Sequence, residues 1–101
     1  MWKLESTDEF GTRLRRWEKK HPDELRAALD NLDTYLKTLE AGVKPLQVKF
    51  GFIHPEPLGV VAIDQSGGKG KGRLAQTRLY VFPDAATEAL HLITLGDKGS
   101  Q

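Results

Sequence analysis

Three side chains with complementary chemistry alternate along one short apolar segment of this 101-residue chain: Arg78, Tyr80 and Phe82. Alternate residues of an extended strand point to the same face, so these three would lie side by side. An arginine pairs with a phosphate, and an aromatic ring stacks on an unpaired base. The pattern therefore makes this segment a candidate contact surface for RNA.

The same alternation has a purely structural explanation. Leu79 and Val81 are apolar as well, and only one face of the strand can belong to the core. On periodicity alone we slightly favour Tyr80 and Phe82 as the core residues, which would leave Leu79 and Val81 outside. That arrangement would remove both rings from an RNA site.

Positive charge gathers in the segment that leads into this strand. The whole chain has a net charge of only +1, which argues against a polyanionic partner, but residues 65–83 contain no acid. Their basic residues are Lys69, Lys71, Arg73 and Arg78. Because surface charges act mainly within about 8–10 Å, a local charge of this size can attract RNA phosphates. A solvated loop kept soluble by its lysines is the alternative, and the sequence leaves both open.

Several other chemistries are excluded or disfavoured. With no cysteine, the chain has no disulfide, thiol nucleophile or cysteine-ligated metal. Its three histidines match no metal-ligand spacing, and residues 67–73 lack both the hydroxyl residue and the following helix of a phosphate-binding Walker loop. We expect no metal and no cofactor. His54, in a loop beside two prolines, joins the candidate RNA contacts.

Helices are expected in the first part of the chain. Phe10, Leu14 and Trp17 lie on one face of a helix predicted for residues 8–20, capped by Thr7 or by the residue after it. Pro22 then opens a second helix, whose apolar stripe continues until glycine 42 ends it. The short joint between the helices predicts an antiparallel helical hairpin.

After residue 42 the hydrophobic period changes from helical to alternating. Residues 46–52 predict a strand or extended segment, and residues 60–63, 79–82 and 90–95 predict an antiparallel meander. Trp2–Glu5 is expected to add a short edge strand. The prediction is a single α+β domain over residues 1–101. We expect it to be cytoplasmic, because no apolar run approaches the roughly 18 residues of a membrane span and the first residues begin no signal peptide.

The chain resembles the RelE/ParE superfamily of type II toxin–antitoxin toxins in the order of these elements and in two short segments. These segments are Arg78-Leu79-Tyr80 and Gly96-Asp97-Lys98-Gly99-Ser100-Gln101. The resemblance is to its HigB-like addiction module killer members in particular. It extends over nearly the whole chain in element order. It implies an N-terminal α-helical hairpin packed on a twisted antiparallel β-sheet.

For function, the resemblance implies a toxin that cleaves mRNA on the ribosome, with the ribose 2′-hydroxyl as nucleophile. Arg78 matches the arginine that the family uses at the phosphate, and Lys98 falls where a basic catalytic residue often follows the last strand. Tyr80 joins these two as a catalytic candidate, on its chemistry rather than on a motif. Chemistry rather than motif makes Lys69, Lys71, Arg73 and His54 RNA contacts. The expected partners are a cognate antitoxin and ribosome-bound mRNA.

Two alternatives stay open at this point. RelE itself carries two lysines on its second strand, where residues 60–63 of this chain have none. A ParE-like protein that inhibits a protein target such as gyrase without catalysis would share the fold. So would a non-toxic interaction domain.

Overall fold

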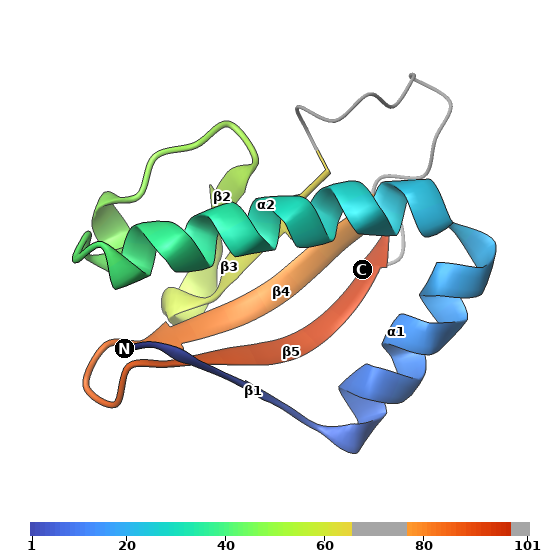
Figure 1. Cartoon of the computed structure of the whole chain (residues 1–101), viewed down its shortest axis with the longest axis horizontal. Helices are drawn as coiled ribbons and strands as arrows, with labels where there is room; N and C mark the ends of the chain where they lie inside the picture. Colours follow the sequence, from blue (N-terminus) through green and yellow to red (C-terminus); the bar gives the residue numbers. More distant parts are fainter. Residues whose placement is uncertain (66–76, 98–101) are drawn as a thin grey trace.

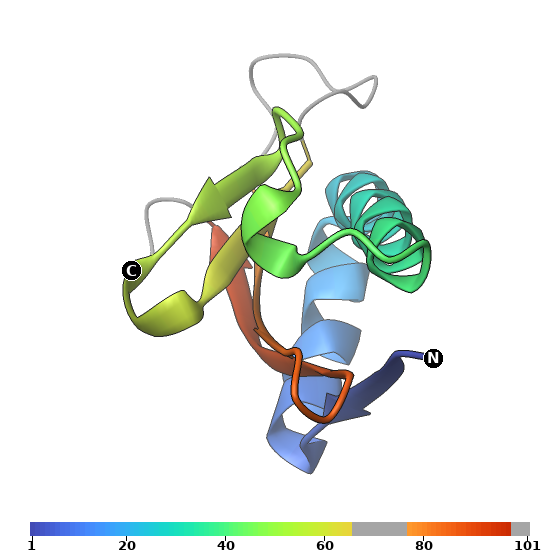
Figure 2. The ribbon, with the colours of Figure 1, turned by 90° about the vertical axis from the view of Figure 1, so that its left-hand side faces the viewer.

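Two helices lie against one face of a five-stranded sheet in the computed structural model, which describes residues 1–65 and 77–97 (Figures 1 and 2). The elements are β1 (Lys3–Ser6), α1 (Asp8–Lys20), α2 (Pro22–Glu40), β2 (Ile53–Pro55), β3 (Val61–Asp64), β4 (Thr77–Asp84) and β5 (Ala89–Asp97), with short 3-10 helices η1 (Pro45–Gln47) and η2 (Pro57–Gly59) on either side of β2. The strand order across the sheet is β1-β5-β4-β3-β2. The predicted α+β class is confirmed.

The predicted helix boundaries are confirmed, and local signals account for them. The Thr7 side chain accepts a hydrogen bond from the Phe10 N–H at 3.1 Å, so Thr7 is the N-cap of α1. Pro22 occupies the first turn of α2, where its missing N–H is not needed. Glycine follows the C-terminal end of α2 at Gly42, with φ +101°, a left-handed conformation that favours glycine there.

The two helices do not form an antiparallel hairpin, so that prediction is wrong. Figures 1 and 2 show α1 running across the direction of α2, with α1 beside β5 and α2 over β3 and β4. Only His21 separates them; its N–H donates to the Trp17 carbonyl and its carbonyl accepts from the Leu25 N–H. An antiparallel helical hairpin needs a loop of roughly 2–5 residues, so a one-residue joint can turn the chain but not reverse it.

The sheet is mixed rather than wholly antiparallel. The predicted meander β3-β4-β5 is confirmed, with antiparallel pairing throughout. β1, however, pairs parallel with β5, from Lys3 opposite Ala89 to Ser6 opposite Leu92. A parallel pair needs a long crossover, and both helices together with β2–β4 supply it. The prediction of an antiparallel sheet is therefore wrong at the β1 edge.

Residues 46–52, predicted as a strand or an extended segment, form no strand. Pro45 begins the 3-10 helix η1, in which the Gln47 N–H donates to the Lys44 carbonyl at 2.8 Å. The alternating apolar residues belong instead to an irregular segment in which Val48 is buried. β2 starts only at Ile53.

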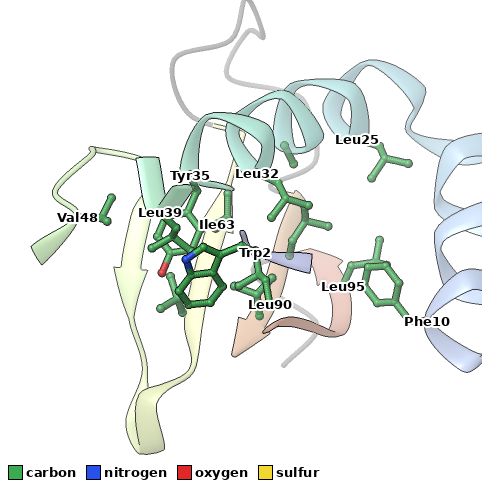
Figure 3. Packing of buried hydrophobic residues seen from close by; sticks show 14 residues of the cluster. Trp2, Phe10, Leu25, Leu32, Tyr35, Leu39, Val48, Ile63, Leu90 and Leu95 are labelled. Carbon is green, nitrogen blue, oxygen red and sulfur yellow. The ribbon is translucent and has the colours of Figure 1, made fainter. Parts of the chain in front are cut away.

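The core lies between the helices and one face of the sheet (Figure 3). Its buried members include Leu25, Leu32, Tyr35 and Leu39 from α2, Phe10 from α1, and Ile63, Leu79, Val81, Leu90 and Leu95 from the strands. Neither helix of the described residues has the length and apolar content that a membrane span requires.

Candidate functional site

The alternation along β4 places Arg78, Tyr80 and Phe82 on the side of the sheet away from the helices. Leu79 and Val81 are 0% exposed within the core, whereas the three residues between and beside them are only partly buried. The periodicity-based preference for Tyr80 and Phe82 as core residues is therefore wrong. The arginine explains why: it shares their face, and a guanidinium placed under the helices would lose its hydration without compensation. We call this side of the sheet the open face.

A histidine and a carboxylate meet on the same face. His54 Nε2 lies 2.6 Å from Asp64 Oδ2, and the two side chains are 37% and 5% exposed. The register explains the contact, because His54 lies opposite Ala62 and Ala62 lies opposite Tyr80. Asp64, two positions beyond Ala62, lies directly opposite Arg78. The strands β2, β3 and β4 thus bring His54, Asp64, Arg78 and Tyr80 around the small residue Ala62.

Helix α2 holds the end of β3 that carries this carboxylate. Asn31 donates a side-chain hydrogen bond to the Asp64 backbone carbonyl at 2.9 Å. Beyond Asp64, the Gln65 side chain accepts the Thr77 N–H at 2.8 Å, and Thr77 accepts a hydrogen bond from the Trp17 indole at 2.7 Å. Both helices are therefore tied to the part of the sheet that positions Asp64 and Arg78.

Two donor atoms on the open face have no partner among the residues that the structure describes. They are the Arg78 Nε and the Tyr80 hydroxyl, and both atoms are buried. A buried donor without an acceptor costs about 1–3 kcal/mol, so such atoms are rare in folded proteins. An anion with several acceptor oxygens would satisfy an arginine N–H and a nearby hydroxyl together.

The arrangement can carry out two chemical tasks. In the tautomer whose Nε2–H donates to the Asp64 carboxylate, the other ring nitrogen of His54, Nδ1, can accept a proton. Arg78 supplies a permanent positive charge on the next strand but one. Together they can move a proton and hold an anion on one surface.

The remaining predicted site residues divide into two groups. Lys69, Lys71, Arg73 and Lys98 lie outside the described residues. Arg78, Tyr80 and His54 are brought together, as described above. Within residues 1–65 and 77–97, no group of three or more potential ligand side chains is arranged to hold a metal ion.

Asp64 is the member of the site that the sequence-based analysis missed. Its signal was available: a single acid ends the apolar run 61–63, ten residues after His54. Recognising the pair requires the β2–β3 register, which depends on the Pro57–Gly59 turn.

Comparisons with protein-family models, with curated proteins and with solved structures find no match.

Proposed function

We propose that this protein is a RelE/ParE-type toxin that cleaves mRNA on the ribosome, and that the open face is its RNA site. One observation carries the proposal: the His54–Asp64 pair, 2.6 Å apart, shares a face with Arg78 and Tyr80, whose buried donor atoms have no partner among the described residues. A proton acceptor beside an anion-binding pair is what RNA cleavage by the 2′-hydroxyl requires.

In the proposed reaction, His54 Nδ1 accepts the proton of the 2′-hydroxyl as its oxygen attacks the adjacent phosphorus. Asp64 keeps the imidazole oriented through the contact to Nε2. Arg78 stabilises the extra negative charge on the phosphate oxygens in the transition state. The bond from phosphorus to the 5′-oxygen breaks, and the Tyr80 hydroxyl donates the proton that the leaving oxygen needs. The products are a 2′,3′-cyclic phosphate and a 5′-hydroxyl end.

A cognate antitoxin is part of the proposal. It would inhibit the toxin by covering the open face with an acidic segment, since burying Arg78 against carboxylates would exclude the RNA phosphate. Residues 65–83 carry four basic residues and no acid, which supports an acidic partner.

The test uses purified protein in a reconstituted translation system, with mRNA cleavage mapped by primer extension. His54→Gln should lower the cleavage rate by about 10²- to 10⁴-fold, the usual contribution of a general base. Arg78→Lys should also lower it, because a lysine cannot reproduce the planar guanidinium. Arg16→Gln, an exposed change on α1, is the matched control and should cleave at the wild-type rate.

Wild-type rates for both site variants would contradict the proposed chemistry. Continued translation in the presence of the wild-type protein, together with loss of DNA supercoiling in a gyrase assay, would instead favour the ParE-like alternative.

A further inference from the structure

A pair of rings occupies the open face at the far end of β4 from the His54–Asp64 pair. Phe82 and His91 are cross-strand partners in the β4–β5 register, and their ring centroids lie 6.2 Å apart with the planes inclined by 33°. Both side chains are partly buried. The pair is on the side of the sheet away from α1 and α2, because Phe82 alternates with the core residue Val81 and lies opposite His91.

A β-bulge is what brings His91 to this face. The register shifts between Tyr80 and Val81: Tyr80 lies opposite Thr94, but Val81 lies opposite Leu92. One extra residue, Ile93, is thereby inserted into β5 between the paired positions. Without this insertion the regular alternation would place Leu92 beside Phe82 and turn His91 toward the helices. The bulge thus keeps the leucines of β5 in the core and places an imidazole next to the phenyl ring.

The turn after β2 lies close to the phenyl ring at Gly59. A Cβ added at Gly59 would lie 3.1 Å from the Phe82 ring, and Gly59 has a φ of +82°. A side chain at residue 59 would therefore require the Phe82 ring to shift by a few tenths of an ångström. The Phe82 ring therefore packs against the turn after β2 as well as beside His91, and this packing lowers the entropy lost when a ligand stacks on it.

We propose that Phe82 and His91 form a stacking site for one unpaired base of the RNA whose phosphate Arg78 binds. This inference rests on the proposed function and adds the substrate class: single-stranded RNA with a base at a fixed distance from the cut. Phe82 lies four positions beyond Arg78 on β4, about 13 Å away at the usual rise per residue. Phosphate and stacked base therefore belong to different nucleotides. Ring faces select by stacking strength rather than by base identity, so a purine is preferred at this position.

The experiment measures single-turnover cleavage of a model mRNA on programmed ribosomes. An abasic ribonucleotide is placed, one position at a time, at each of three positions on either side of the cut. For the wild-type protein, one position should lower the rate by about fivefold to a hundredfold, the usual effect of losing one stacked base. Phe82→Leu should lower the rate on intact RNA by a similar factor and should no longer respond to the abasic site. Phe82→Trp should restore both the rate and the response.

Control variants separate stacking from folding. Ile93→Ala, an exposed change on the same strand as His91, should behave as the wild type. Thermal unfolding of each variant shows how much stability it loses. If Phe82→Leu cleaves more slowly but still responds fully to the abasic site, the ring acts only through the fold, and the stacking site is overturned while the proposed cleavage stands. If the wild-type protein cleaves no RNA, the proposed function itself is overturned.

Discussion

Replacing Arg78 by methionine should make the protein more stable while abolishing the proposed RNA cleavage. The change keeps an unbranched aliphatic side chain of similar length on the open face of β4. It removes the guanidinium, including a buried Nε that has no hydrogen-bond partner in the described part of the chain. The ion pairs among the described residues do not include Arg78 either.

The expected gain follows from the unpaired donor. A buried donor without an acceptor costs about 1–3 kcal/mol, and part of this is offset by hydration of the more exposed end of the guanidinium. Asp64 lies opposite Arg78 and would lose a nearby positive charge, but His54 remains as its hydrogen-bonded partner. We therefore expect the free energy of unfolding to rise by about 1 kcal/mol, or roughly 4–8 °C in melting temperature for a domain of this size.

Urea unfolding at pH 7, followed by tryptophan fluorescence, measures the effect, and the cleavage assay is run on the same preparations. Arg16→Met is the matched control, because Arg16 is exposed on α1 and methionine and arginine have similar helix propensities. Its free energy of unfolding should change by less than about 0.5 kcal/mol.

A loss of more than about 1 kcal/mol in Arg78→Met would refute the reasoning, because it would show that the guanidinium stabilises the fold through contacts worth more than its burial costs. Retained cleavage in a stabilised variant would refute the functional role alone. Only a stability gain combined with lost cleavage fits an arginine retained for its ligand, since functional sites are commonly less stable than the fold allows.

Three further predictions concern the packing around the site. Burial raises the pKa of Tyr35 to about 12, so the free energy of unfolding of the wild-type protein should fall progressively from pH 10 to pH 12. Tyr35→Phe should lose less stability over that range, which urea unfolding at pH 8 and pH 11 measures. Thr77→Val should cost about 1–3 kcal/mol because it leaves the Trp17 indole N–H without its acceptor, and a double-mutant cycle with Trp17→Phe should give a coupling energy of about 1 kcal/mol. Gly59→Ala should lower the free energy of unfolding by about 1–2 kcal/mol, because its φ is positive and an aromatic ring lies 3.1 Å from the new Cβ, whereas Gly51→Ala, with no atom within 4 Å, should not.

The helices were predictable because their signals are local. A threonine cap, a proline in the first turn and apolar residues at helical spacing act within one or two turns of the chain. The relative direction of the helices was not predictable, because it depends on how α1 and α2 pack against the sheet. In residues 46–52 a local pattern was misleading. Their apolar residues alternate as in a strand, but they lie in an irregular segment that follows the 3-10 helix begun by Pro45.

The candidate site was predictable residue by residue but not as an arrangement. Arg78 and Tyr80 were expected on one face, yet both faces of β4 are apolar enough to form a core, and periodicity alone favoured the wrong one. The bulge in β5 has only a faint signal, the change in leucine spacing from two residues (Leu90 to Leu92) to three (Leu92 to Leu95). The His54–Asp64 contact depends on the β2–β3 register, which no local pattern specifies.

The edge of the sheet at β2 restricts how a protein partner can bind. Two backbone hydrogen bonds show which residues around β2 direct their N–H and carbonyl groups toward β3. They run from the Asp64 N–H to the Phe52 carbonyl and from the Glu56 N–H to the Val60 carbonyl. The backbone polar groups of Ile53 and Pro55, which alternate with these residues, therefore point away from β3 toward the free edge of the sheet. The Ile53 N–H already donates to the Phe50 carbonyl at 3.0 Å, and proline has no N–H.

This edge consequently offers acceptors but no donors, and an added strand could form only half of its usual hydrogen bonds there. An antitoxin that neutralises the proposed activity is then not expected to extend the sheet beyond β2. It must bind side chains instead of backbone groups. The partly exposed imidazole of His54 lies on the same strand, between Ile53 and Pro55. A partner that covers the open face would therefore reach His54 and Arg78 together, whereas one confined to the edge would leave the proposed site accessible to RNA.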